Sequence, residues 1–334
     1  ITEKYVYILP WVVKIDLSCD DLGSANTKLF NAINADIAFM EPSVLSSILW
    51  AMARLGYQWN NLPSYLQQSL VNALKSATGQ MDAQCISNIL WALARLYFGN
   101  HANQQDIQVV VQSLFNVVPV GMVSDPVLGN QLVLAFYYFR NSVKNITFAC
   151  DVYEQKKPIT TESPAQCDIL LQISTTLQCD LLHEAVVCGC TVDAVFGNFV
   201  IEIDGPHHQK HYQRLTDIFQ NTLLSQSGIT SIRIDLSAYY ASSREDRIQW
   251  IQTLAEVLKG NISPTSLSQI KGVKVTMGIE EILSNNEQKA SDIALNPYAK
   301  IFVPSLRFFP SATNGNIRSN VQLGAINGTN KKIG

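Results

Sequence analysis

Charged residues are scarce in this chain. Of its 334 residues, 15% are Asp, Glu, Lys or Arg and 47% are hydrophobic, with a net charge of −3 and a pI of about 6.0. This hydrophobic share is enough to build a substantial core. The lack of a basic excess excludes a protein that binds nucleic acid through its overall charge, so any nucleic-acid surface must be a local patch.

Long apolar runs are also missing. The longest run, residues 109–123, is interrupted by Gln112, Asn116 and Pro119, so it is unsuited to cross a membrane as a helix. No signal-peptide pattern opens the sequence. The seven cysteines are odd in number and scattered, which predicts free thiols in a reducing compartment, the cytoplasm or an organelle matrix. We expect no membrane partner.

Two stretches in the N-terminal half repeat each other. Residues 43–57 contain Ile-Leu-Trp-Ala-Met-Ala-Arg-Leu, and residues 84–97 contain Ile-Leu-Trp-Ala-Leu-Ala-Arg-Leu. Trp50 and Trp91 stand 41 residues apart, and a degraded copy without the tryptophan follows at 132–139. A period of about 40 residues is typical of stacked helical hairpins. The pattern predicts an α-solenoid of helical-hairpin repeats.

Each copy places an arginine one helical turn after its tryptophan: Arg54 follows Trp50, and Arg95 follows Trp91. One interpretation is structural, with the guanidinium stacked on the indole to join neighbouring repeats. The other places both arginines on a concave surface that grips single-stranded RNA. Over about residues 25–140, the repeat resembles the octotricopeptide-type repeats of organelle RNA-binding proteins.

A different pattern begins near residue 160. Residues 191–206 alternate apolar and polar side chains around Gly197-Asn198, a natural two-residue turn because both residues tolerate positive φ. The predicted hairpin has one wholly apolar face and sets Asp193 opposite Glu202 on the other. Directly opposed carboxylates destabilise a sheet. We therefore expect a cation, a proton or a basic side chain beside them.

The sequence around this hairpin predicts a small α/β module. Helices are expected at 165–178, 213–226 and 244–258, and strands at 183–190 and 230–236. The order is helix, strand, hairpin, helix, strand, helix. It predicts an α/β sandwich built on a small mixed sheet.

The hairpin carries a recognisable run of residues. Val192-Asp193-Ala194 and Ile201-Glu202-Ile203-Asp204-Gly205-Pro206-His207-His208 resemble the RAP domain, which ends mitochondrial and chloroplast RNA-processing proteins and commonly follows helical repeats. The match covers about residues 165–258. It implies a fold similar to the PD-(D/E)XK restriction endonucleases.

The endonuclease resemblance implies roles for individual residues. Asp193 and Glu202 would be catalytic carboxylates that hold Mg²⁺ or Mn²⁺. Asp204 stands where many of these nucleases have a lysine, and it would serve as an added metal ligand or a base. His207 and His208 would assist proton transfer or bind phosphate.

Arg214 lies on the helix predicted after the hairpin, where many RAP domains carry basic residues, and Lys210 lies just before it. Both a phosphate contact and a solvated face explain them. Over residues 184–260, six basic residues stand against nine acidic ones, so a phosphate-binding surface must be narrow. Nearby thiols also invite comparison with a zinc site, but their spacing favours buried thiols. The residues concerned are Cys179, His183, Cys188 and Cys190.

These patterns predict an α+β multidomain protein: helical repeats over 1–155, an endonuclease-like domain over 160–260, and a low-complexity, partly disordered extension over 261–334. We expect an RNA-binding and RNA-processing protein, with repeats that grip single-stranded RNA and a RAP-like domain that contacts or cleaves it with a divalent metal. The alternative is a non-enzymatic scaffold that binds a protein partner and carries a catalytically dead nuclease-like domain.

Overall fold

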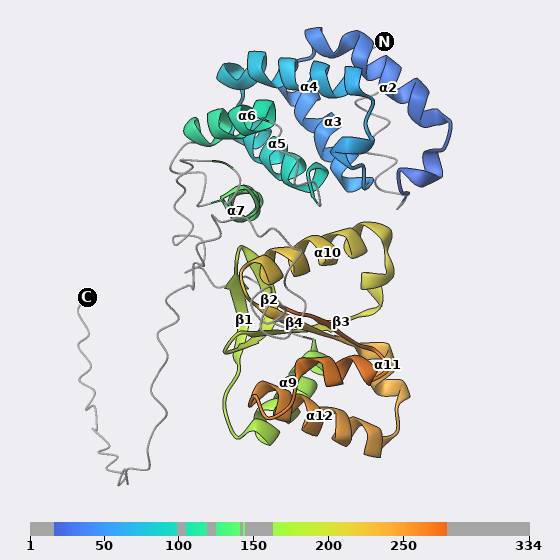
Figure 1. The fold of residues 1–334 in the computed structure, drawn as a ribbon, viewed down its shortest axis with the longest axis vertical. Helices are drawn as coiled ribbons and strands as arrows, with labels where there is room; N and C mark the ends of the chain where they lie inside the picture. Colours follow the sequence, from blue (N-terminus) through green and yellow to red (C-terminus); the bar gives the residue numbers. More distant parts are fainter. Residues whose placement is uncertain (1–16, 99–104, 119–124, 141–142, 144–162, 279–334) are drawn as a thin grey trace, which may run out of the picture. The chain divides into compact units, whose positions relative to one another are not determined.

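The computed structural model describes residues 17–98, 105–118, 125–140, 143 and 163–278 (Figure 1). Over these ranges the N-terminal part is helical, and the C-terminal part combines helices with one five-stranded mixed sheet. The predicted combination of a helical region with a small α/β module is confirmed. In the described part of the chain, we find no helix with the length and apolar character needed to span a bilayer.

The N-terminal helices form two rows. Their bounds are α2 (Ala25–Asp36), α3 (Pro42–Arg54), α4 (Ser64–Ala77), α5 (Ala83–Leu96), α6 (Gln105–Asn116) and α7 (Pro126–Phe139). The helices that carry the repeat copies contact one another in chain order, α3 with α5 and α5 with α7. The intervening helices do the same, α2 with α4 and α4 with α6. Two-row stacking lets each helical pair bury an apolar face that it cannot bury alone.

The period of the sequence reappears in the contacts between helices. The Tyr138 hydroxyl donates to the carbonyl oxygen of Tyr97 at 2.6 Å, and the Ser87 hydroxyl donates to that of Leu128 at 3.2 Å. Each pair is 41 residues apart in the chain. Equivalent positions of successive copies are therefore neighbours, including the degraded third copy in α7.

The sheet runs in the order β1-β2-β3-β4-β5. Its strands are β1 (Leu182–Val187), β2 (Cys190–Phe196), β3 (Phe199–Asp204), β4 (Thr230–Asp235) and β5 (Val273–Thr276). Neighbouring strands are antiparallel except β3 and β4, which are parallel. A parallel pair needs a crossover connection, and here the crossover is the helix α10 (His211–Gln226).

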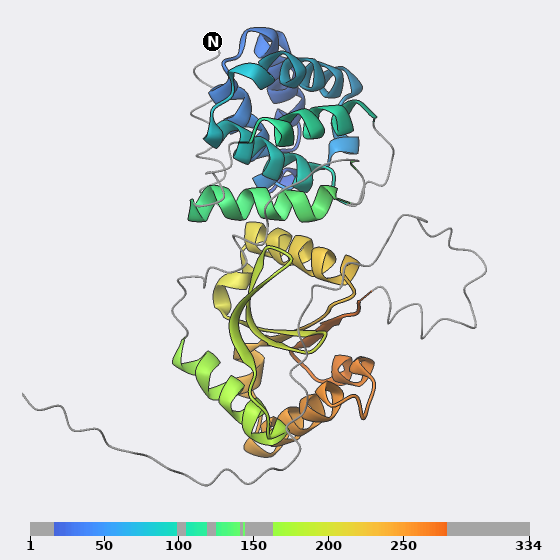
Figure 2. The same cartoon turned by 90° about the vertical axis from the view of Figure 1, so that its left-hand side faces the viewer.

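Helices cover both faces of the sheet. The helices beyond β4 are α11 (Leu236–Ala241) and α12 (Arg244–Leu258), and α9 (Pro164–Leu177) precedes β1. Figure 2 shows α10 on one face of the sheet and the contacting pair α9 and α12 on the other. This three-layer arrangement is the predicted α/β sandwich.

The β2–β3 hairpin keeps the predicted register near its turn. Phe196 pairs with Phe199 and Ala194 with Ile201, and Gly197 has the positive φ, 57°, that such a turn requires. The ladder ends there, one pair before Asp193 and Glu202 would meet. The two carboxylates therefore lie where the strands part.

The sequence prediction missed the end of the module. The strand β5 pairs with β4 and completes the sheet, and a 3₁₀ helix, Pro264–Gln269, precedes it. The predicted domain boundary at residue 260 is therefore too early, and the first part of the predicted extension (261–334) belongs to the sheet. A four-residue strand gives too few side chains for a period of two to be recognised. Residues 279–334 lie outside the described part.

One hydrophobic core joins the helical region to the α/β module. The Phe219 ring of α10 lies 5.5 Å from the Phe98 ring and 5.8 Å from the Tyr138 ring. The same core reaches Val195 and Val200 on the α10 face of the sheet. A second core fills the space between the opposite face and the helices α9 and α12. The module thus has its own core and shares another with the repeats.

This shared core predicts a large effect of one substitution. Phe219→Ala should lower the free energy of unfolding by about 3–5 kcal/mol, because it empties a site that is 3% exposed. Ile218→Ala, on the same helix but 52% exposed, is the matched control and should change stability by about 0.5 kcal/mol at most. Urea unfolding followed by tryptophan fluorescence measures both. Equal midpoints for the two variants would contradict a shared core.

Candidate functional site

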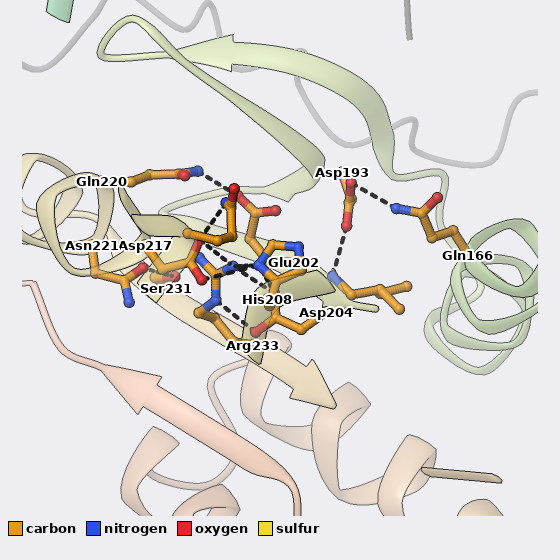
Figure 3. A network of polar contacts seen from close by, with 12 residues as sticks. Gln166, Asp193, Glu202, Asp204, His208, Asp217, Gln220, Asn221, Ser231 and Arg233 are labelled. Carbon is orange, nitrogen blue, oxygen red and sulfur yellow. Dashed lines mark hydrogen bonds and ion pairs between the residues drawn. The ribbon is translucent and has the colours of Figure 1, made fainter. Parts of the chain in front are cut away.

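Polar side chains from three elements gather where β3 and β4 run parallel. Glu202 and Asp204 come from β3, Arg233 from β4, and Asp217 and Gln220 from α10 (Figure 3). In the parallel register Glu202 lies directly beside Arg233. The strand pairing therefore brings a buried cation next to the two carboxylates of β3.

Asp193 is held by two neutral N–H donors. Its carboxylate accepts from the backbone N–H of Ile203 at 2.6 Å and from the Gln166 amide at 3.0 Å. The Gln166 side chain is itself fixed, because its oxygen accepts from the backbone N–H of Ser163 in a capping box that begins α9. Burial raises the pKa of Asp193 although both hydrogen bonds work in the opposite direction.

Glu202 is buried, with 8% of its surface exposed. Its carboxylate accepts from the Gln220 amide at 2.5 Å. Burial raises the pKa of Glu202 to about 8, repulsion from Asp193 adds to the increase, and Arg233 opposes it. At neutral pH Glu202 therefore holds a proton, which is one of the three partners that the sequence predicted for this pair of carboxylates.

Arg233 is the centre of an ion-pair network. Its side chain is 4% exposed. Its Nε donates to Asp204 at 2.9 Å, and its Nη2 also contacts Asp204 and lies 3.1 Å from Asp217. Burial works against the charged form, yet the bonds to Asp204 and the nearby carboxylates raise the pKa of Arg233. The guanidinium is thus a permanent charge inside the fold.

Asp217 and His208 complete the network. The His208 Nδ1 lies 3.0 Å from Asp217 and 3.4 Å from Asp204. The Gln213 amide donates to the other oxygen of Asp217 at 3.0 Å. Although burial acts against ionisation, His208 and then Arg233 hold the pKa of Asp217 below its usual value. Asp217 therefore stays ionised near neutral pH.

The predicted catalytic residues divide into two sets. Asp193 and Glu202 are bonded to amides, whereas Asp204 and His208 belong to the Arg233 network. Asp204, which stands where the endonuclease resemblance would imply a lysine, is thus paired with an arginine from the next strand. The side chain of the fifth predicted residue, His207, lies outside the described part.

Sequence reasoning missed Arg233, Asp217, Gln166 and Gln220 as site residues. A signal was available for Arg233, because it stands between Ile232 and Ile234 in a short apolar strand, and a charge at such a position is almost never buried without a partner. The two glutamines carried no comparable signal, since their roles depend on how α9 and α10 pack on the sheet.

The described residues contain one group of three candidate metal ligands: Asp204, His208 and Asp217, whose donor atoms lie within 4.8 Å of one another. The Arg233 guanidinium contacts all three side chains. The predicted metal carboxylates, Asp193 and Glu202, do not belong to this group. Their binding of Mg²⁺ or Mn²⁺ stays a prediction.

The alternative zinc interpretation fails in the described part of the chain. None of its members joins the candidate metal group. Cys188 and Cys190 are buried in the shared core, as the thiol interpretation expects, whereas Cys179 is exposed, contrary to it. Burial also raises the pKa of Cys190 well above its usual value, which keeps its thiol protonated.

Arg95 is corrected from a predicted RNA contact to an interior residue. It is 6% exposed, and its guanidinium lies 5.0 Å from the Trp91 ring and 5.3 Å from the Phe219 ring. Burial lowers its pKa to about 10, and repulsion from Arg54 contributes. Such a side chain offers no surface to RNA. The structural interpretation, stacking on the indole, holds for Arg95.

The other predicted nucleic-acid residues lie nearer the surface. Arg54 is half-buried, 5.2 Å from the Trp50 ring and 4.0 Å from the ring of Tyr212 on α10. Lys210 and Arg214 are exposed at the start of α10. The first turns of α10 therefore bring three of the four predicted basic residues into one region.

No family model matches this chain, and no curated protein matches it.

The pKa of Glu202 makes stability depend on pH. Its folded-state pKa of about 8 is above the ordinary value of 4.5, so the folded state binds the proton more tightly than the unfolded state. The free energy of unfolding therefore falls as pH rises from about 4.5 to 8, by at most about 1.4 kcal/mol per pH unit. Glu202→Gln keeps the shape and removes this loss. It should gain stability over wild type at pH 8.5 and little at pH 5.

Urea midpoints at the two pH values provide the measurement. Glu245→Gln, an exposed glutamate on α12, is the control for the change in net charge and should follow the wild type at both pH values. If Glu202→Gln ran parallel to wild type as well, Glu202 would not be the buried proton-binding group.

Proposed function

We propose that this protein acts on nucleic acid, with single-stranded RNA as the substrate, and that its α/β module holds Mg²⁺ or Mn²⁺ through Asp193 and Glu202. The observation that carries the proposal is the state of these two carboxylates. Glu202 is buried, Asp193 is half-buried, and both have raised pKa values. Among the described residues each is hydrogen-bonded only by neutral N–H donors. A divalent cation would compensate both charges at once.

The proposal includes the finer description of the fold. We infer that the stacked helices are an α-solenoid and that the module is a RAP-like domain with the endonuclease-type arrangement. The support is the 41-residue contact period of the helices, and the order hairpin, crossover helix and parallel strand in the sheet. The same hairpin carries the Glu-x-Asp-Gly-Pro run that motivated the resemblance.

The chemistry we propose is hydrolysis of a phosphodiester. A bound divalent cation would activate water for attack at phosphorus. Asp193 and Glu202 would hold the cation, oriented by Gln166 and Gln220. Because Asp204 is engaged by Arg233, we assign it to positioning, and we assign His208 to proton transfer or phosphate contact.

The nucleic acid would approach along the start of α10. Lys210 and Arg214 are exposed there, and later turns of the same helix carry Asp217 and Gln220. A strand bound by these two basic residues would therefore lie close to the carboxylates. The repeats would mainly support α10, since Arg95 is buried and Lys75 is paired with Asp106.

A second candidate is a non-enzymatic scaffold that binds a protein partner. The observation in its favour is that the Arg233 network neutralises Asp204 and Asp217 without any metal. The two candidates differ in salt dependence. Phosphate binding should weaken steeply between about 50 and 200 mM salt, whereas a protein partner held by apolar contacts should not.

Cleavage assays test the enzymatic proposal. Labelled RNA and DNA are incubated with Mg²⁺ or Mn²⁺, and the double variant Asp193→Asn, Glu202→Gln should lose activity by more than the factor of about 10–100 that residues supporting a metal ligand typically contribute. The isosteric changes preserve packing. Asp168→Asn, on α9 outside the site, is the control. Equal cleavage by wild type and double variant, or no cleavage by either, would contradict the proposed nuclease activity.

Binding assays test the surface. Lys210→Ala together with Arg214→Ala should weaken RNA binding for all sequences and reduce the salt slope by about one for each phosphate that is no longer neutralised. Arg244→Ala, an exposed arginine at the start of α12, is the matched control and should leave both quantities unchanged. If the RNA affinity does not change with salt concentration, or if no RNA binds, the scaffold candidate is favoured.

A further inference from the structure

Arg233 lies where a metal ion would be expected. Asp204, His208 and Asp217 present two carboxylates and one imidazole within 4.8 Å of one another. This is a donor set that suits Mn²⁺, Zn²⁺ and other first-row cations. The guanidinium of Arg233 contacts all three: it lies 3.3 Å from His208 Nδ1 and 3.1 Å from Asp217, and it donates to Asp204.

The position of Arg233 is set by its charge, because one of its hydrogen-bond donors is left without a partner. Its Nε and Nη2 are bonded, but its buried Nη1 has no hydrogen-bond partner among the residues that the structure describes. Leaving a buried donor unpaired costs about 1–3 kcal/mol. The position is tolerated because the guanidinium neutralises two carboxylates that would otherwise repel each other. The cluster requires a positive charge, and Arg233 supplies it.

We propose that Arg233 is the resident cation of this site: it takes the place of a metal ion among Asp204, His208 and Asp217 and closes these residues to divalent metals. Its register beside Glu202 also places this positive charge next to the buried carboxyl group of that residue. The consequence that only Asp193 and Glu202 are open to a divalent cation rests on the proposed function. The competition between arginine and metal does not.

Removing the arginine should open the site. Arg233→Met replaces the guanidinium with an apolar chain and leaves the three ligands without a cation. Isothermal titration with Mn²⁺ and with Zn²⁺ should then show one more bound equivalent per chain than the wild type. Adding Asp217→Asn to Arg233→Met should abolish the additional equivalent. Arg247→Met, an arginine near Tyr239 and Tyr240, is the matched control and should keep the wild-type stoichiometry.

Two results would overturn the proposal. One is a folded Arg233→Met variant with the wild-type stoichiometry. The other is a wild type that already loses a bound metal when Asp217→Asn is introduced alone. If Arg233→Met does not fold without metal, recovery of its circular dichroism with Mn²⁺ or Zn²⁺ supports the proposal, and failure with both ions overturns it.

The readout separates this inference from the proposed function. A wild type that binds no metal and cleaves nothing would end the nuclease proposal, while a gain of one equivalent in Arg233→Met would still support the resident cation. Conversely, the wild type could bind one equivalent through Asp193 and Glu202 while the variant gains none. That result would leave the nuclease proposal standing and overturn the proposal that Arg233 is the resident cation.

Discussion

The ion pair between the buried Arg233 and the half-buried Asp204 is the interaction around which the polar side chains of the α/β module are arranged. Taking a guanidinium and a carboxylate out of water costs several kcal/mol for each charge, and only close geometry offsets that cost. The parallel pairing of β3 with β4 provides this geometry, and Asp217 extends it to α10. Through these two ion pairs Arg233 ties together two strands and the helix that crosses between them.

This interaction leaves charge unevenly compensated across the site. Asp204 and Asp217 both face the fixed positive charge of Arg233. Asp193 and Glu202 have only amide donors among the described residues, and burial drives both pKa values up. Repulsion from Asp193 adds to the increase for Glu202. The site therefore contains two kinds of carboxyl group: one pair is compensated by Arg233, and the other pair has only amide donors and raised pKa values.

The sequence predicted the elements that depend on local chemistry. The Gly197-Asn198 turn set the hairpin register, and the repeat pattern located α3 and α5 within a few residues. It did not predict which residues from distant elements would meet. Arg233 was missed because its role depends on the parallel register with Glu202. Arg95 was misplaced because the repeat alone does not show that α10 covers its face of the helix.

The packing of α10 explains why the helical repeats can matter for the site without touching its chemistry. One side of this helix carries Phe219 into the core shared with the repeats, and the next residue, Gln220, donates to Glu202. Adjacent helical residues point in different directions, so the same helix reaches both the shared core and the site. A shift of the helix against the repeats would therefore move both contacts together. The aromatic and arginine residues of the repeats therefore hold in place the helix that orients Glu202.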